Sequence, residues 1–337
     1  MATVSVCIPT YNQCSYVEDS IRSAFNQTLK PMEIIVCDDC STDDTRLVLE
    51  KLKAEIPILK VVYQPINMGI SKNVDTCLRM GTGELILRLD SDDKIFPQFI
   101  EKVSALLTEY PEAGYGHVAI QEIDQYDKTM SVRRLFRNSV YVDSVEALKA
   151  ATRGYRVAAN IVMFRRLALE ELGYMTTTIN FAEDYYLSVK IADANYGNVY
   201  LDEVLASYRV WTDVGKVRQR RKLDEIKGIY GVFKDALEPA FKDRGWNTAE
   251  LEERKSDKAC AHADCLGWDV YSAAEKKELA DLLLQLSSSN RVKAMIWLYG
   301  NGFGQVIQFV SKLTGIPRSL AKKLAIGFNR TIKVRNK

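Results

Sequence analysis

Two clusters of acidic residues each follow a short, largely apolar segment of this chain. Residues 33–37 lead into an Asp-Asp-Cys-Ser-Thr-Asp-Asp sequence at 38–44, and residues 85–89 lead into Asp-Ser-Asp-Asp at 90–93. Short apolar runs bounded by turn residues are typical of buried strands in an α/β sheet. Ligands of such sheets bind beyond the carboxyl ends of the strands. The sequence therefore predicts that both clusters lie at one edge of one sheet.

Carboxylates that crowd at one edge repel each other unless a cation or a hydrogen-bonding ligand joins them. The divalent cations Mg²⁺ and Mn²⁺ prefer oxygen ligands of this kind. The two clusters therefore predict a divalent metal that binds together with a phosphate-bearing ligand.

As far as Asp90, the chain alternates between strand-like and helix-like segments, and the segment at about 97–215 is more mixed. Ser41 or Thr42 is expected to cap a helix that contains Leu47, Leu49 and Leu52. The alternation predicts a run of βα units and hence a mostly parallel sheet. Further strands are predicted at 4–8, 58–63, 116–123 and 161–164, and further helices at 15–27, after the turn at 67–71, at 97–109 and after residue 184.

The remainder of the chain has the apolar spacing of helices, as at Leu223, Ile226 and Tyr230. Two more helices are predicted near 248–265 and 273–288. A chain of 337 residues suggests one large or two modest domains. We therefore expect an α/β domain at 1–215, a helical extension at 216–290 and a basic amphipathic segment at 291–337.

Charge is unevenly distributed along the chain. The net charge is only +2, yet the residues from Arg291 onward contain ten Lys and Arg and no Asp or Glu. Within this segment, Pro317 is expected to open a helix with Leu320, Leu324 and Phe328 on one side. Apolar faces beside one-signed charge predict an interfacial helix on an anionic membrane surface. The alternative is a helical packing domain with a solvated basic tail.

Other features bear on compartment and partners. We find no run of about 18 apolar residues that could span a bilayer and no segment typical of a signal peptide. The seven cysteines are odd in number and scattered, which is typical of a reducing cytoplasm. The Cys and His residues do not make a complete four-ligand zinc set. No nucleic-acid-binding module is recognised, so no nucleic acid is expected as a partner.

Five short motifs lie within residues 3–215, at 4–12, 33–43, 67–69, 83–93 and 183–184. In this order and at this spacing, they resemble the motifs of the family 2 glycosyltransferases of GT-A fold. The resemblance implies an α/β, GT-A nucleotide-diphospho-sugar transferase fold with a mostly parallel central sheet and a C-terminal helical extension. It also implies an inverting, metal-dependent enzyme that moves one sugar from a nucleotide-diphosphate donor, with a UDP-sugar favoured, to an acceptor hydroxyl.

Relatives of this kind often extend a lipid-linked oligosaccharide at the cytoplasmic leaflet. The resemblance therefore implies a glycan acceptor that is lipid-linked or part of a bacterial surface polysaccharide. It also implies a cytoplasmic enzyme that is peripheral on the inner face of the cytoplasmic membrane. The sequence at 219–221, Gln-Arg-Arg, is not the Gln-x-x-Arg-Trp motif of processive synthases, which favours addition of single sugars.

The Asp90-Ser91-Asp92 sequence resembles the DXD motif of the family. By this resemblance, Asp92 is the direct ligand of Mn²⁺ or Mg²⁺, and Asp90 contacts the metal through water or contacts the ribose. Side chains alternate along an extended segment, so Asp90 and Asp92 can face one way. The alternative is an acidic turn that caps a helix beginning near Pro97.

The first loop and the first acidic cluster resemble the part of the family that holds the nucleotide base. Pro9, Thr10 and Tyr11 are expected to lie along the base, with the Tyr11 ring stacked on it. Asp39 is expected to hydrogen-bond the base, with Asp38 beside it. The alternatives are an ordinary packed ring for Tyr11 and a turn cap for Asp38.

Four more donor-binding residues follow from the resemblance. Asn67 belongs to the motif at 67–69, and Lys72 stands where many relatives have arginine, so it would contact phosphate as a point charge. Arg88 is expected either to orient the carboxylates or to balance charge in the core. Trp211 stands where many relatives have His in a Tyr-Arg-x-His sequence. Because an indole cannot ligate a metal, either fewer protein ligands are used or the ring packs over a sugar.

The Glu183-Asp184 pair resembles the catalytic ED motif of the family. Asp184 is predicted to be the base that removes the proton of the acceptor hydroxyl, with Glu183 as support or as an acceptor contact. The alternative is an acidic pair at a helix N-terminus, favoured by the helix dipole.

Two other functions would also use these carboxylates or the nucleotide. A nucleotidyltransferase is disfavoured by the Glu183-Asp184 pair and by the lack of a Gly-rich phosphate loop. A non-catalytic, nucleotide-binding scaffold at the membrane surface is disfavoured by the intact set of carboxylates.

Overall fold

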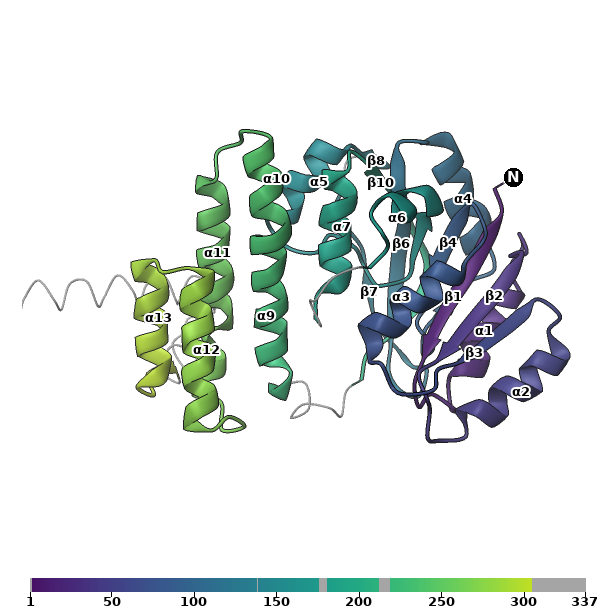
Figure 1. Cartoon of the computed structure of the whole chain (residues 1–337), viewed down its shortest axis with the longest axis horizontal. Helices are drawn as coiled ribbons and strands as arrows, with labels where there is room; N and C mark the ends of the chain where they lie inside the picture. The colour runs from purple at the N-terminus through teal and green to yellow at the C-terminus, as the bar shows by residue number, and fades with distance from the viewer. Residues whose placement is uncertain (1, 138, 176–180, 212–218, 305–337) are drawn as a thin grey trace, which may run out of the picture. The chain divides into compact units, whose positions relative to one another are not determined.

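The computed structural model describes residues 2–137, 139–175, 181–211 and 219–304. The chain divides between residues 213 and 214 into two compact units. Unit 1 contains a sheet with helices, and the described part of unit 2 is helical (Figure 1).

One ten-stranded sheet forms the centre of unit 1, in the order β3-β2-β1-β4-β9-β6-β10-β5, with β7 paired to β6 and β8 to β10. β1 to β4 pair in parallel, as do β6 and β10. Because β9 is antiparallel to both β4 and β6, all of these parallel strands point the same way. The strands are β1 Val4–Thr10, β2 Glu33–Asp38, β3 Leu59–Tyr63, β4 Leu85–Arg88, β5 Lys94–Ile95, β6 Ala113–Ile123, β7 Thr129–Arg133, β8 Tyr141–Val142, β9 Val162–Arg165 and β10 Gly197–Arg209.

Helices cover both faces of this sheet (Figure 1). α1, α2 and α4 contribute to the core on one face, and α3, α6 and α7 to the core on the other. The helices are α1 Val17–Phe25, α2 Thr45–Glu55, α3 Ile70–Met80, α4 Phe99–Glu109, α5 Ser144–Ala151, α6 Arg166–Glu171 and α7 Glu183–Asp193.

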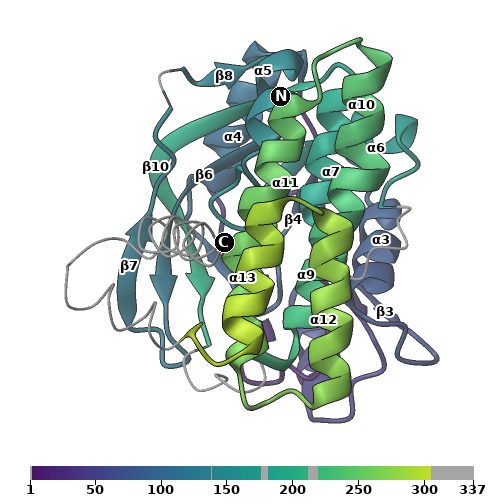
Figure 2. The ribbon, with the colours of Figure 1, turned by 90° about the vertical axis from the view of Figure 1, so that its left-hand side faces the viewer.

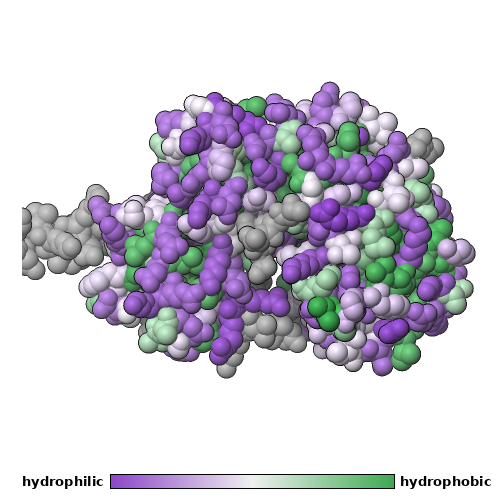
Figure 3. Space-filling model, viewed as in Figure 1, coloured by the Kyte–Doolittle hydropathy of each residue, from purple (hydrophilic) through white to green (hydrophobic). Residues whose placement is uncertain are grey.

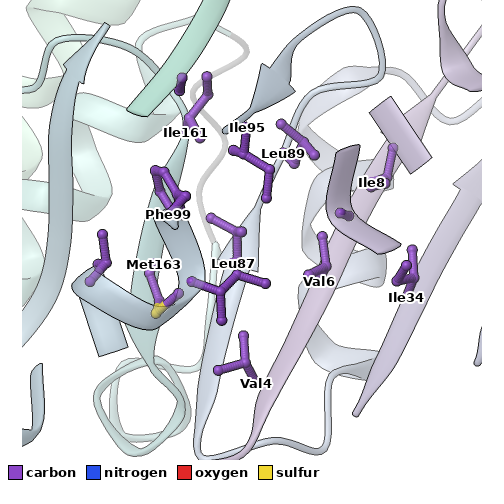
Figure 4. Close-up of a cluster of buried hydrophobic side chains, with 14 of the residues drawn as sticks. Val4, Val6, Ile8, Ile34, Leu87, Leu89, Ile95, Phe99, Ile161 and Met163 are labelled. Carbon is purple, nitrogen blue, oxygen red and sulfur yellow. The ribbon is translucent and has the colours of Figure 1, made fainter. Parts of the chain in front are cut away.

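The alternation of side chains along the strands determines which face each residue packs on. On β1, Val4, Val6 and Ile8 lie in the cluster with α1, α2 and α4 (Figure 4), whereas Cys7 lies in the cluster with α3. A fully buried Val or Ile stabilises the fold by about 1.5–3 kcal/mol relative to an exposed one. A register slip of one residue would exchange the two faces, so this pattern fixes the position of the carboxyl end of β1.

The predicted cap of α2 was wrong. α2 begins at Thr45 after Asp44, with no side-chain cap hydrogen bond. The Ser41 hydroxyl instead donates to Asp38, and its oxygen accepts from the backbone N–H of Asn12 at 2.8 Å. The carboxylate of Asp43 accepts from the N–H of Thr45 at 3.0 Å. The hydroxyl that the sequence offered for the cap is thus used in the loop that follows β2.

The described part of unit 2 consists of helices that pack side by side (Figure 2). Ser272 forms a capping box with Glu275 at the start of α12, and Ser289 caps α13. The predicted helix at Pro317 lies outside the described residues. The helices are α9 Lys222–Val232, continued by a π-helical turn at Phe233–Leu237 into α10 Glu238–Asp243, then α11 Ala249–His262, a 3-10 turn at Ala263–Gly267, α12 Ala273–Leu286 and α13 Asn290–Gly300.

The surface is mostly hydrophilic on the face shown in Figure 3, with smaller hydrophobic areas between the polar ones. Among the helices of the described residues, none is both long enough and apolar enough to cross a bilayer.

Candidate active site

The carboxyl ends of β1, β2 and β4 meet at one edge of the sheet. Thr10, the last residue of β1, pairs with Asp38, the last residue of β2. On the other side of β1, Cys7 pairs with Arg88, the last residue of β4. The two acidic clusters therefore follow β2 and β4, the parallel strands on either side of β1, and lie at one edge of the sheet, as the sequence predicted. Pro9 lies within β1 beside Cys37.

The first acidic cluster braces the loops around it. The oxygens of Asp39 accept from the backbone N–H groups of Met68 and Gly69, at 2.8 and 2.9 Å, and Asp39 is only 2% exposed. Asp38 accepts from the hydroxyl and the backbone N–H of Ser41, the latter at 3.3 Å. Asp38 thus caps the turn that follows β2, which is the alternative that the sequence left open for it.

The loop at 67–69 carries two of the predicted donor-binding residues to this edge. The side-chain oxygen of Asn67 accepts from the N–H of Gly69 at 3.2 Å, and Gly69 has a φ of +85°, a conformation that favours glycine. Lys72 is exposed in the first turn of α3. Tyr11, which follows β1, is 44% exposed. Its ring therefore faces solvent rather than the core.

The second acidic cluster is a turn and not the extended segment that was expected. The N–H of Asp93 donates to the carbonyl of Asp90 at 3.0 Å, which closes residues 90–93 into a turn. The alternative reading, a cap on the helix near Pro97, is also wrong, because β5 follows the turn and α4 has no side-chain cap. The buried hydroxyl of Ser20 donates to the carbonyl of Asp93 at 2.5 Å and so ties this turn to α1.

Arg209, at the end of β10, fixes this acidic turn. Its guanidinium donates to the carbonyl of Asp92 at 3.0 Å, and its backbone N–H donates to the Asp93 carboxylate at 2.8 Å. The same guanidinium donates to the carbonyl of Asp124 at 2.6 Å and to the Asp127 carboxylate at 2.7 Å. The sequence interpretation gave Arg209 no role, although a strand-terminal arginine beside the expected site was a visible signal.

Arg88 joins the acidic turn to the predicted base. It is only 2% exposed, and it donates to the two Asp90 oxygens at 2.9 and 3.3 Å. Its third hydrogen bond goes to Asp184, which lies 96 residues further along the chain. One buried guanidinium therefore contacts two carboxylates, and its positive charge opposes theirs.

Glu183 and Asp184 occupy the first turn of α7, after Ala182 with a φ of +66°. A non-glycine residue in this region costs about 1–3 kcal/mol. The helix N-terminus favours their negative charge, so the alternative reading also describes their place in the fold. It does not account for the contact of Asp184 with Arg88.

Burial dominates the electrostatics of the carboxylates around Arg88. Burial raises the pKa of Asp184 to about 7; Arg88 opposes this rise, while Glu183 and Asp90 add to it. Burial likewise raises the pKa of Glu183, partly offset by Arg88. Burial, together with the charge of Asp90, raises the pKa of Asp92. This part of the site holds more negative charge than its hydrogen-bond donors neutralise.

The donor set fits a divalent cation that is shared with a phosphate ligand. Within the described ranges, no three His, Cys, Asp or Glu side chains group into a ready-made metal site. Mg²⁺, however, is commonly held by one or two carboxylates plus phosphate oxygens and water. Asp92 and Asp90 supply two carboxylates, and Oδ2 of Asp93 is buried without a hydrogen-bond partner among the described residues. Burial and then the charge of Asp90 raise the pKa of Asp92, and a bound cation would offset both effects.

Trp211 lies against the acidic turn. Its indole N–H donates to Oδ2 of Asp92 at 3.0 Å, and its ring meets the Tyr16 ring edge to face, with centroids 5.4 Å apart. Asp90, Asp92, Asp184 and Trp211 are thus brought together around the turn. Among the described residues, no hydrogen bond joins Tyr11 or Lys72 to this group. Tyr11 follows β1, and Lys72 lies in the first turn of α3.

Comparison with known proteins gives a consistent family. Residues 5–173 match the model of the family described as Glycosyl transferase family 2. Over 98 residues the chain is 40% identical to a chondroitin synthase of Escherichia coli, a match that covers 29% of this chain and 14% of that protein. Over 119 residues it is 34% identical to a GalNAc(5)-diNAcBac-PP-undecaprenol beta-1,3-glucosyltransferase of Campylobacter jejuni, covering 35% and 37%. The chain thus spans well under half of either relative.

Solved structures show the fold. The crystal structure of S. aureus TarS 1-349 covers 98% of this chain and 91% of its own, with a TM-score of 0.60 and 18% identity; this fragment is also solved with UDP-GlcNAc. The mannosyltransferase PcManGT from Pyrobaculum calidifontis, solved with GDP-Man and Mn²⁺, covers 97% and 88%, with a TM-score of 0.56 and 17% identity. The predicted GT-A fold, with helices after it, is confirmed.

Proposed function

This chain belongs to glycosyl transferase family 2, and on that premise we propose that it transfers one sugar from a nucleotide-diphosphate donor to an acceptor hydroxyl, with inversion at the anomeric carbon. The observation that carries the proposal is the buried Arg88, which contacts both Asp90 of the acidic turn and Asp184 of α7. The Arg88 guanidinium thus holds Asp90, a carboxylate on the donor side, next to Asp184, the proposed base.

The nucleotide is proposed to lie across the carboxyl ends of β1 and β2, along Pro9 and Thr10. The exposed ring of Tyr11 is available to stack on the base. Asp39 remains the proposed base contact, because each carboxylate oxygen has two lone pairs and can accept a second hydrogen bond. Lys72 stands at the N-terminus of α3, where an ammonium group and the helix end both attract phosphate.

Asp92, with Asp90 beside it, is proposed to hold Mn²⁺ or Mg²⁺ together with the donor diphosphate. When bound, the metal would stabilise the negative charge that develops on the leaving diphosphate. Arg209 holds the backbone of the turn before any ligand arrives. The carboxylates therefore need little reorganisation on binding, which is the condition for effective electrostatic stabilisation.

Asp184 is proposed to act as the general base. Its ionised carboxylate takes the proton of the acceptor hydroxyl while the hydroxyl oxygen bonds to the anomeric carbon. The bond from that carbon to the diphosphate breaks, and its electron pair leaves with the diphosphate. A single displacement of this kind inverts the anomeric centre. A pKa of about 7 suits a base that works near neutral pH. Glu183 is proposed to contact the acceptor.

A lipid-linked or surface-polysaccharide glycan is the proposed acceptor, and a UDP-sugar is the favoured donor. The Campylobacter jejuni relative is named for an undecaprenol-linked substrate, and the TarS fragment has been solved with UDP-GlcNAc. These names support the choice of donors and acceptors to test first.

The segment 291–337 is proposed to bind the anionic inner face of the cytoplasmic membrane, after a catalytic domain at 1–215 and a helical extension at 216–290. Near the end of α13, the rings of Trp297 and Phe303 stack at 5.5 Å and are 51% and 46% exposed. Exposed aromatic rings and basic residues suit a membrane interface. Removing residues 305–337 should weaken binding to anionic liposomes, and unchanged partitioning would exclude this role.

The reaction is tested by thermal stabilisation with UDP-, GDP-, dTDP- and CMP-sugars, each with Mn²⁺ and with a chelator. A ligand that binds only the folded protein raises its apparent stability by about 2.7 kcal/mol at 100 times its Kd. We expect a metal-dependent rise with one nucleotide class, and Asp92→Ala should remove it. A donor that stabilises Asp92→Ala normally in the presence of metal would contradict the assignment.

A further inference from the structure

Trp211 makes a contact with the acidic turn that a packing residue does not need. Its indole N–H donates to Oδ2 of Asp92 at 3.0 Å, across 119 residues of sequence. An indole N–H can only donate a hydrogen bond, and it cannot ligate a cation. Trp211 can therefore orient the Asp92 carboxylate, but it cannot itself be a ligand of the metal.

The indole itself is held in place. The indole and the Tyr16 ring are perpendicular, and the guanidinium of Arg209 lies over the Tyr16 ring at 4.3 Å from its centroid. The Tyr16 hydroxyl donates to the carbonyl of Gln125 at 3.2 Å. Arg209 also donates to the carbonyl of Asp92, so both the backbone and the side chain of Asp92 are held from the end of β10.

One lone-pair direction of the Asp92 carboxylate is used by the indole, and an ionised carboxylate has about four. The remaining directions can meet a cation, while the hydrogen bond keeps the carboxylate from rotating. Partners that hydrogen-bond a metal-ligating side chain in this way typically account for a 10–100-fold difference in metal affinity.

We propose that Trp211 is a positioning residue that orients Asp92 for a divalent cation shared with the donor diphosphate. Where a histidine could have ligated the metal, Trp211 instead donates a hydrogen bond to Asp92, the proposed metal ligand. This inference rests on the proposed metal-dependent transfer, since it concerns the same carboxylate.

The test is the affinity for Mn²⁺, measured from the electron paramagnetic resonance signal of the free ion, with UDP and separately with GDP present. Trp211→Phe keeps a ring but removes the N–H, and it should weaken Mn²⁺ binding by about 10–100-fold. Trp211→Gln keeps an N–H donor without adding an imidazole ligand, and its Mn²⁺ affinity should lie between those of Trp211→Phe and the native chain. Trp297→Phe, a matched change at an exposed site in unit 2, should leave it unchanged.

Tryptophan emission gives a second readout that does not depend on activity. Mg²⁺ added with the nucleotide should change the emission of the native chain and of Trp297→Phe, and the change should be absent from Trp211→Phe. Native-like Mn²⁺ affinity in a folded Trp211→Phe would overturn the inference alone. If the native chain binds no Mn²⁺ with either nucleotide, the proposed metal-dependent function fails together with it.

Discussion

The two acidic clusters of the sheet edge differ in how their charge is compensated. In the first cluster, Asp39 accepts hydrogen bonds from two backbone N–H groups. Asp43 accepts from the backbone N–H and the hydroxyl of Thr45, at 3.0 and 2.5 Å. Although burial opposes it, these hydrogen bonds lower the pKa of Asp43. Around Arg88 the outcome is reversed, because burial raises the pKa values of Asp92 and Asp184.

The comparison separates bracing carboxylates from carboxylates available for chemistry. Asp39, Asp43 and Asp92 all follow strands of one sheet, whereas Asp184 lies in the first turn of α7. The number of local donors distinguishes the two kinds. A carboxylate whose lone pairs are used by the backbone stabilises a loop. A buried carboxylate whose negative charge is not fully compensated by hydrogen-bond donors is stabilised most by binding a cation or a proton. The reactive chemistry is therefore expected at Asp92 and Asp184.

Replacing a carboxylate in each region tests this division, and Asp184→Asn should have the largest effect. Without a base, the transfer rate should fall by about 10²–10⁴-fold, while the thermal shift with donor and Mn²⁺ persists. Asp43→Asn is the matched control in the first cluster, and its transfer rate should stay within a few-fold of the native value. Comparable losses in both variants would remove the distinction between the regions.

The pH dependence of the transfer should reflect the second region. Asp184 must be deprotonated to accept the acceptor proton, and its pKa is raised to about 7. The value of kcat/KM for transfer should therefore fall about tenfold per unit below pH 7 and level off above it. Arg88 favours the ionised form, so Arg88→Met should move this fall to higher pH. A profile that is flat from pH 5.5 to 8 would exclude Asp184 as the titrating base.

Loss of a bracing carboxylate should act through stability. Asp39→Ala removes the acceptor of two partly buried N–H groups, those of Met68 and Gly69, and the loss of two hydrogen bonds should cost about 1–3 kcal/mol in the free energy of unfolding. Asp39→Asn keeps one oxygen acceptor and should lose less. Urea unfolding measures both variants, and a native stability of Asp39→Ala would show that the brace is dispensable.

The smallest expected effect is that of Ser41→Ala, which removes a hydroxyl that donates to Asp38. The free energy of unfolding should fall by about 1 kcal/mol, and kcat of transfer should remain within two-fold. If kcat falls by more than two-fold while the free energy of unfolding is unchanged, Ser41 acts in the reaction and not in stabilising the loop.

Much of the fold could be predicted because its signals are local. The apolar runs before Asp38 and Asp90 became β2 and β4, and the turn at 67–71 was followed by α3, as expected. The pairing of β1 with both of those strands then placed the clusters at one edge. Each step depends only on side-chain alternation, apolar spacing and the parallel geometry of βα units.

The details of the site depended on contacts between distant residues. The cap predicted at Ser41 failed because Asp38 takes its hydroxyl. The turn at 90–93 depends on Ser20 and Arg209, which lie about 70 and 117 residues away. The position of Trp211 in the sequence excluded a metal ligand but could not reveal its hydrogen bond to Asp92.

The sequence alone determined the α/β class, the two strands that end in acidic clusters, and the residue types that could bind metal or remove a proton. Only the tertiary structure decided which carboxylates are braced and which are left undercompensated. The physical reason is that the pKa of a carboxylate depends on burial and on donors that other strands supply. For Asp184 the decisive neighbour, Arg88, is 96 residues away along the chain.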